Sequence, residues 1–255
     1  MISIIIPAKN EALNIGLLLK DISKQSLRSK EVIVASSSTD KTNQIARNFG
    51  AKVTKGTVDG CVGKARNLGA AKATGDILIF LDADVRLPRR ETLANLVSHF
   101  KTNKMEIANS FLVANSDKMI YRTIFSSYNL LLKFESFINV LISAPGICLI
   151  VNRKLFESIG GFDVDLKNSE DIDLIRRIMK LGHRYNVIPF RVTTSVRRFE
   201  NKNSRELALL ILAGIAFPVL LNLRWKFLKK YLAILEGYYG ETGGSKLQAE
   251  DQPLS

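Results

Sequence analysis

Two carboxylates, Asp82 and Asp84, follow directly after the apolar run at residues 77–81. Burying a carboxylate is costly unless another group pairs with it, so an apolar strand that ends in two acids suggests a ligand at its end. Residues two apart on a strand project to the same face, and open α/β sheets bind ligands at the carboxyl ends of their strands. We therefore expect the two aspartates to share a divalent cation, either Mg²⁺ or Mn²⁺.

The expected cation also indicates what else binds. Magnesium usually takes one or two protein carboxylates and completes its shell with water and substrate phosphates. We therefore expect a diphosphate to bind the same cation. The D-x-D pattern alone is weak evidence, because a turn at a strand end is an ordinary alternative. Other phosphate motifs fit poorly, since Ala65 replaces the Ser or Thr that a P-loop needs and no G-x-G-x-x-G follows the first strand.

The elements that must position these acids alternate along the chain. Short apolar runs at residues 2–6 and 31–35 are separated and followed by helix-like stretches, which is typical of βαβ units. We expect an α/β fold, Rossmann-like, with a mostly parallel central sheet flanked by helices. The expected helices begin near Asp40, Val62, Tyr121 and Ser169 and end near Gly50, Ala73, Ile142 and Gly182.

Composition narrows the classes of partner. The 255 residues, 46% of them hydrophobic, suffice for one large domain or one domain with an appendage. The formal charge of +13 favours phosphorylated ligands or an anionic membrane, and nucleic acid is disfavoured because the basic residues are dispersed. Cys61 and Cys148 lack metal-site spacing and suggest reduced thiols, and the N-terminus shows no secretory signal, so we expect the catalytic part to face the cytosol.

The C-terminal region has a different character. Residues 207–223 carry no charge, and Arg224 and Lys226 follow them with further lysines. A membrane span needs about 20 apolar residues and Pro218 weakens a straight helix, so we favour an in-plane or re-entrant segment, with a single span or a buried core helix as alternatives. The expected parts are a catalytic domain (1–203), hydrophobic and basic helices that associate with the cytoplasmic face of a membrane (204–240) and a flexible tail (241–255).

Five stretches resemble, in order and spacing, the family 2 glycosyltransferases of the A-type (GT-A) fold. They are IIIPAKNE at 4–11, SSTDKT at 37–42, GKARNLGAAKATGDILIFLDADVRLP at 63–88, GGFD at 160–163 and SEDIDLIRR at 169–177. The ordered set is far more specific than any one of its members. The resemblance implies a GT-A fold and an enzyme that transfers a sugar, with inversion, from a nucleotide diphosphate sugar.

The same resemblance implies roles for individual residues. Asp171, paired with Glu170, would be the general base that takes the proton of the acceptor, although acids at a helix start are also simply favourable charges. Asp84 and Asp82 would hold the metal. The residues implied in binding the nucleotide sugar are Pro7, Ala8, Asn10, Glu11, Ser38, Asp40, Lys64, Arg66, Asn67, Asp82, Ala83, Arg197 and Arg198.

The sequence therefore predicts an inverting, metal-dependent glycosyltransferase. The hydrophobic C-terminal region suggests a lipid-linked acceptor, such as a polyprenyl phosphate or a glycolipid. One alternative is a sugar nucleotidyltransferase, which would carry a glycine-rich basic loop where this chain has PAKNEA. Another is a non-catalytic membrane-surface adaptor on the same fold, against which the intact Asp82, Asp84 and Asp171 speak. The nucleotide, the sugar, the acceptor and the oligomeric state stay open.

Overall fold

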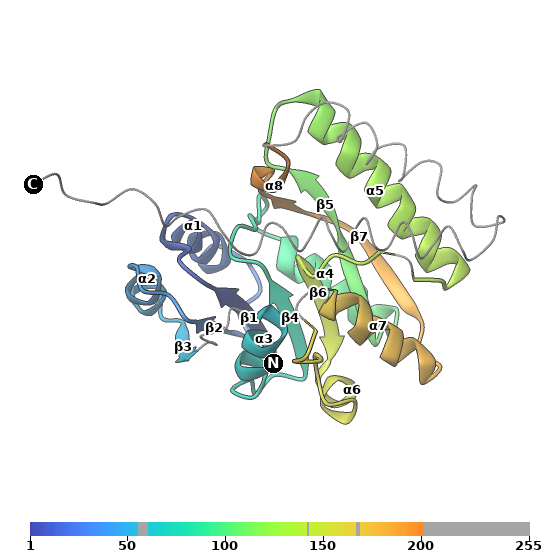
Figure 1. Cartoon of the computed structure of the whole chain (residues 1–255), viewed down its shortest axis with the longest axis horizontal. Coiled ribbons are helices and arrows are strands. Elements are labelled where there is room, and N and C mark those ends of the chain that lie inside the picture. Colours follow the sequence, from blue (N-terminus) through green and yellow to red (C-terminus); the bar gives the residue numbers. More distant parts are fainter. Residues whose placement is uncertain (56–60, 142, 167–168, 201–255) are drawn as a thin grey trace, which may run out of the picture.

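The computed structural model describes residues 1–55, 61–141, 143–166 and 169–200. These residues form a seven-stranded sheet with helices on both faces (Figure 1). The strands are β1 (Ile2–Ala8), β2 (Lys30–Ser36), β3 (Lys52–Lys55), β4 (Ile77–Leu81), β5 (Ile107–Ala114), β6 (Cys148–Asn152) and β7 (Tyr185–Thr194). The helices are α1 (Ala12–Ser23), α2 (Thr42–Asn48), α3 (Val62–Ala70), α4 (Thr92–Thr102), α5 (Met119–Ile138), α6 (Arg153–Ser158), α7 (Glu170–Lys180) and α8 (Arg197–Glu200).

The sheet is mostly parallel, as predicted, and has the strand order β3-β2-β1-β4-β6-β5-β7. Only β6 runs against its two neighbours within this described sheet, pairing antiparallel with β4 and with β5. The reversal brings the start of β6 to the carboxyl end of β4, where Leu81 lies opposite Cys148 and the N–H of Asp82 donates to the carbonyl of Ile147 at 3.1 Å. The residues just before β6 therefore lie at the edge where ligands bind.

The central strand β4 is buried on both faces. Ile77, Ile79 and Leu81 pack into the core that includes residues of α1, α2, α4 and α5, and Leu78 and Phe80 pack into the core beneath α6 and α7. A strand covered on both sides reads as a continuous apolar run, which explains its sequence. This double burial fixes the point at which the chain emerges with Asp82.

Helix limits differ from the predicted ones, since α5 runs from Met119 to Ile138 where a helix over 121–142 was expected. Helix α3 ends at Ala70, three residues before the expected end. Ser169 precedes α7 as predicted, but it has a left-handed backbone (φ 62°) and makes no side-chain cap hydrogen bond. The expected helical connection is confirmed as α5, and no helix in the described ranges is long and apolar enough to cross a membrane. The predicted segments at 204–240 and 241–255 lie outside the described residues.

Candidate active site

Asp82 and Asp84 lie in a turn rather than on the face of a strand. Strand β4 ends at Leu81, and the N–H of Val85 donates to the carbonyl of Asp82 at 3.1 Å, which closes the turn. Ala83 is buried between the two acids, whose side chains are each 19% exposed. Asp82 and Asp84 reach different arginines, so the turn directs the two carboxylates to two sides of the site.

Arg66 is the centre of the first side. It projects from α3, is 3% exposed, and its guanidinium donates to Asp82 Oδ1 at 2.9 Å, Glu170 Oε1 at 2.6 Å and the carbonyl of Gly146 at 3.1 Å. Its carbon Cζ also lies 5.4 Å from the ring centre of Phe162. Burial acts to lower the pKa of Arg66, but the surrounding carboxylates outweigh it and raise that pKa, so the group stays charged.

Asp171 lies beside this charge cluster, in the first turn of α7. Burial raises the pKa of Asp171 to about 7, and the negative charge of Glu170 acts in the same direction. Arg66 and the backbone N–H groups of Ile172 and Gly146 oppose the rise. A carboxyl whose pKa lies near the working pH is well suited to accept a proton in general base catalysis.

Gly146 joins Arg66 to Asp171, and sequence reasoning missed it. Its carbonyl accepts from Arg66 while its N–H donates to Asp171. A Cβ at this position would lie 2.7 and 2.9 Å from the two terminal nitrogens of Arg66 and 2.9 Å from Asp171 Oδ2, which is too close. The Pro145-Gly146 pair before the apolar run of β6 is a turn signal that pointed to this loop.

Buried polar groups hold the loop at residues 143–147 in place. Glu135 of α5 is fully buried, and its Oε1 accepts from the N–H and the hydroxyl of Ser143 at 3.0 and 3.1 Å. Asn109 of β5 donates to the carbonyls of Pro145 and Cys148 at 2.7 and 3.1 Å. The position of Gly146 is therefore set by α5 and β5 as well as by its own chain.

Arg197 occupies the second side of the site. Its Nη2 lies 3.3 Å from Asp84 Oδ2 and 3.4 Å from both carboxylate oxygens of Glu11. These contacts join the end of β7 to the end of β4 and the β1–α1 turn, and the Arg197 side chain stays 54% exposed. An exposed cation held over two carboxylates can turn to an incoming anion. Arg198 follows it in α8.

Two neighbouring turns form the predicted nucleotide side. Asn10 has a left-handed backbone (φ 55°), its N–H donates to Ser38 Oγ at 2.8 Å, and its Oδ1 accepts from the N–H of Thr39 at 3.0 Å. Asp40 accepts from the N–H of Ala12 at 3.1 Å. The turns after β1 and β2 are thus cross-tied by the side chains predicted to contact the nucleotide, and they continue from Pro7 and Ala8 at the end of β1.

Asn67 and Lys64 diverge from Arg66 on the same helix. The side chain of Asn67 donates to the carbonyl of Phe162 at 2.7 Å and accepts from its N–H at 2.9 Å, so it fixes the GGFD loop. Gly161 in that loop has a φ of 73° and approaches Asn67 closely. Lys64 lies on the exposed side of α3. Their predicted contacts with the donor stay predictions.

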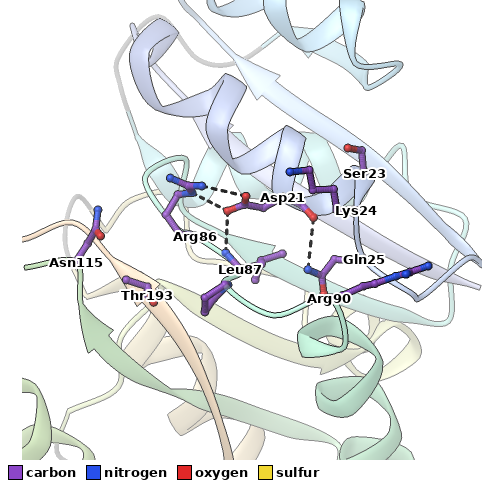
Figure 2. A pocket seen from close by; sticks show the side chains of 10 residues that line it. Asp21, Ser23, Lys24, Gln25, Arg86, Leu87, Arg90, Asn115 and Thr193 are labelled. Carbon is purple, nitrogen blue, oxygen red and sulfur yellow. Dashed lines mark hydrogen bonds and ion pairs between the residues drawn. The ribbon is translucent and has the colours of Figure 1, made fainter.

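A polar pocket of about 770 Å³ lies beside these groups (Figure 2). Arg86 reaches Asp21 through two hydrogen bonds of 2.6 and 3.0 Å, and the N–H of Leu87 donates to the same carboxylate at 3.1 Å. The described lining residues are Asp21, Ser23, Lys24, Gln25, Arg86, Leu87, Pro88, Arg90, Asn115 and Thr193. None of the residues predicted for the active site belongs to this lining.

The carboxylates suit a hard divalent cation. Within the described ranges, no three His, Cys, Asp or Glu side chains gather into a ready-made metal site. Asp82 and Asp84 nevertheless offer two oxygen donors on one turn, which is the number of protein carboxylates that Mg²⁺ commonly takes when substrate phosphates complete its shell. Each of these carboxylates is paired with a different arginine, and a cation shared between them and a bound diphosphate stays a prediction.

Loss of the Arg66 charge should destabilise the protein strongly. Arg66→Met keeps the length of the side chain but leaves Asp82 and Glu170 without their buried partner, and we expect the free energy of unfolding to fall by about 3–5 kcal/mol. Urea unfolding near neutral pH measures the change. The matched control is Arg153→Met, because the ion pair of Arg153 with Glu157 is more exposed and should cost at most about 1 kcal/mol. Equal losses in the two variants would contradict the central role of Arg66.

Solved structures share this fold. A mannosyltransferase from Pyrobaculum calidifontis, solved in complex with GDP-Man and Mn²⁺, aligns with a TM-score of 0.67 at 23% identity over 84% of this chain and 61% of that one. Residues 1–349 of Staphylococcus aureus TarS, solved with UDP, align with a TM-score of 0.62 at 23% identity over 84% and 65%. At such identities the likeness shows the fold, and it confirms the GT-A class that the sequence predicted.

The sequence places the protein within that class. Residues 3–160, more than half of the chain, match the family described as Glycosyl transferase family 2, and the chain belongs to this family. A stretch of 105 residues is 42% identical to a 4,4'-diaponeurosporenoate glycosyltransferase of Staphylococcus haemolyticus, and one of 106 residues is 34% identical to the Staphylococcus aureus enzyme. Each match spans 39% of this chain and 28% of the relative, so the chain aligns with less than a third of these relatives' length.

Proposed function

We propose that this protein is an inverting glycosyltransferase that moves a sugar from a nucleotide diphosphate sugar to an acceptor. The observation that carries the proposal is the buried Arg66, which joins Asp82, on the predicted donor side, to Glu170 beside Asp171, on the acceptor side. Membership of glycosyl transferase family 2 supports it, and so do neighbours of the same fold that were solved with GDP-Man or UDP.

Asp171 supplies the chemistry on the acceptor side. The acceptor oxygen forms a bond to the anomeric carbon of the sugar, on the face opposite the diphosphate, while the bond from that carbon to the diphosphate oxygen breaks. The acceptor proton passes to the Asp171 carboxylate, and the nucleoside diphosphate leaves with the electron pair. Arg66 and the N–H of Gly146 hold Asp171 and its neighbour Glu170 in position for this transfer.

The donor side must bind a diphosphate and stabilise its growing charge. A divalent cation bound by Asp82 and Asp84 would neutralise the diphosphate as a Lewis acid. Arg197, which lies between Glu11 and Asp84, is placed to donate hydrogen bonds to the departing phosphate oxygens. The turns that contain Asn10, Ser38 and Asp40 would receive the nucleoside.

Nucleotide binding tests the function most directly. We expect one nucleotide diphosphate sugar from a panel of UDP and GDP donors to raise the melting temperature in the presence of Mn²⁺ or Mg²⁺, because ligand at about 100 times its dissociation constant adds about 2.7 kcal/mol of stability. If no donor in the panel raises it with either metal, the adaptor alternative is favoured. Release of pyrophosphate from a nucleoside triphosphate and a sugar phosphate would favour the nucleotidyltransferase alternative.

Asp84 should be essential for metal-dependent transfer. We expect Asp84→Ala to reduce transfer by at least about 10²-fold, since metal contributions to transition-state stabilisation are several kcal/mol. Initial rates across a titration of Mn²⁺ measure the effect. Asp76→Ala is the matched control, because Asp76 lies at the opposite end of β4 and its side chain is 89% exposed. Wild-type rates and metal response in Asp84→Ala would remove Asp84 from the metal site.

The acceptor and the place of action complete the proposal. The uncharged residues 207–223 and the basic residues after them support association with the cytoplasmic face of a membrane and an acceptor that is lipid-linked, such as a polyprenyl phosphate or a glycolipid. The staphylococcal relatives carry the name 4,4'-diaponeurosporenoate glycosyltransferase.

A further inference from the structure

Helix α5 carries large apolar side chains on its outer face as well as on its inner one, and on the outer face they lie among exposed polar residues such as Ser126 and Lys133. Its inner face buries residues such as Ile124, Phe125 and Leu132 against the rest of the protein. Its outer face carries Met119, Leu130 and Phe137, whose exposed fractions are 70%, 64% and 78%. In Figure 1, α5 runs along the edge of the molecule, beside β5 and β7.

The three exposed residues form one line. At 100° per residue, positions 119, 130 and 137 fall within about 20° of one another around the helix axis. A surface helix of a soluble domain normally places mainly polar residues on this side. We therefore expect a binding partner to cover the outer face of α5, which is defined by Met119, Leu130 and Phe137.

The charges that border this outer face are mainly positive. Arg122 and Lys133 are exposed on α5, and Arg184 donates to the carbonyl of Phe137 at 2.9 Å, which places a guanidinium at the end of the line. The one acidic residue of α5, Glu135, points inward and is fully buried. Asp117, just before the helix, is paired with Arg122 at 3.2 Å. Apolar side chains bordered by basic ones match the requirements of an anionic membrane surface.

The chain itself offers a rival cover for this face. The uncharged stretch at 207–223 follows shortly after α8, where Phe199 packs against Phe125 of α5 with ring centres 5.7 Å apart. However, residues 201–230 contain six basic residues and one acidic residue, so this part of the chain would bring positive charge to a border that is already positive. Charge complementarity favours anionic lipid over the protein's own C-terminal region.

We propose that the outer face of α5 docks on an anionic lipid surface. This inference rests on the proposed function and extends it, because it assigns membrane contact to residues within the catalytic part of the chain. Glu135 of the same helix binds the loop that contains Gly146, so α5 would connect the lipid surface to the acceptor side of the site. A lipid-linked acceptor would then reach Asp171 from the surface on which α5 lies.

A fluorescent side chain on α5 tests the contact locally. The 255-residue chain carries one tryptophan, so Phe137→Trp is combined with Trp225→Phe, and Leu13→Trp in the same background is the control. Leu13 is 89% exposed on α1. Vesicles of phosphatidylcholine alone are compared with an equal mixture of phosphatidylcholine and phosphatidylglycerol. We expect the anionic vesicles to shift the emission of Phe137→Trp to the blue and bromolipids to quench it, while the emission of Leu13→Trp stays unchanged.

Charge and apolar variants add a second readout. In vesicle flotation, Leu130→Glu/Phe137→Glu and Arg122→Gln/Lys133→Gln should each weaken binding to the anionic vesicles by at least about tenfold, because they remove buried apolar area or surface charge. Leu13→Glu should float like the wild type. Added salt should weaken the binding of the wild type further.

Three results would overturn the proposal. The emission of Phe137→Trp could remain unchanged with anionic vesicles, or it could respond equally to neutral ones. It could also be shifted to the blue and shielded from iodide before any vesicle is added, which would show that the chain covers its own α5. Thermal shift with donor and Mn²⁺ separates the two proposals, because a protein that docks but binds no nucleotide would reject the transferase and keep the lipid contact.

Discussion

Asp171→Asn is expected to slow sugar transfer about 10²–10⁴-fold, which is the usual contribution of a positioned general base. The amide has nearly the same shape as the carboxylate but cannot accept the acceptor proton. Donor binding should survive, because the groups expected to bind the diphosphate are Asp82, Asp84 and Arg197. Initial rates at saturating donor, with donor thermal shift in parallel, measure both properties.

The pH dependence of the wild type provides a second measurement of the same residue. Because its pKa is raised to about 7, Asp171 is protonated in acid, and transfer should rise with pH through about 7 and then level off. The folded protein keeps this proton between pH 4 and 7, where an unfolded aspartate has lost it, so the stability contributed by the protonated group is lost as the pH rises to about 7. Asp171→Asn lacks this loss and should melt at a higher temperature than the wild type at pH 8.

The control for both measurements is on the same helix. Asp173 is paired with Arg177 at 2.7 Å, and not with Arg66, so Asp173→Asn should retain transfer and its pH profile. A wild-type rate in Asp171→Asn would show that another group takes the proton. A lower melting temperature than the wild type at pH 8 would contradict the raised pKa.

Gly146→Ala should disrupt the site with a single added methyl group. The new Cβ would lie within 2.9 Å of both terminal nitrogens of Arg66 and of Asp171 Oδ2, and neither group has room to retreat because Arg66 is buried and bonded on three sides. We expect overpacking to cost about 1–3 kcal/mol of stability. Transfer should fall about 10²-fold or more, since displacements of about 1 Å at reacting groups have effects of this size.

Gly16→Ala is the control for the added methyl group. Gly16 lies in α1, where a Cβ would meet only the side chain of Ile45, at 3.4 Å, and alanine is the better helix former there. This variant should transfer normally and be at least as stable as the wild type. Steady-state rates and urea unfolding compare the two variants, and similar activity in both would show that the loop at 143–147 can move without loss of function.

The sequence predicted those parts of the site that lie at the ends of regular elements. The apolar run of β4 and its two aspartates, the turn after β1, and the acids at the start of α7 were all expected, and the mostly parallel sheet with helices on both faces is confirmed. These elements could be predicted because burial and helix periodicity leave local patterns in the sequence. The exact shape of the D-A-D turn was not predictable, because the end of β4 depends on where β6 begins to pair.

The interior of the site depends on contacts between distant parts of the chain. Arg66 was expected to face the donor, and the structure also gives it Glu170, 104 residues away. Gly146 was missed because its importance lies in the two side chains that it contacts. A single sequence does not show which residues contact one another in the folded protein. The same is true of Glu135, a single acidic residue within the largely apolar α5, which binds the loop beside the site.

Arg66 also bears on how such enzymes could be recombined. The part of the fold from β1 to β4 contains the predicted donor site, whereas the part from the loop before β6 onward contains Gly146, Glu170 and Asp171. A single buried side chain of the first part is bonded to both. Exchanging one part for that of a relative would leave this guanidinium with mismatched acceptors unless they were exchanged with it. In engineering terms, the two halves are not independent modules, and a chimaera must inherit Arg66 together with its whole set of acceptors.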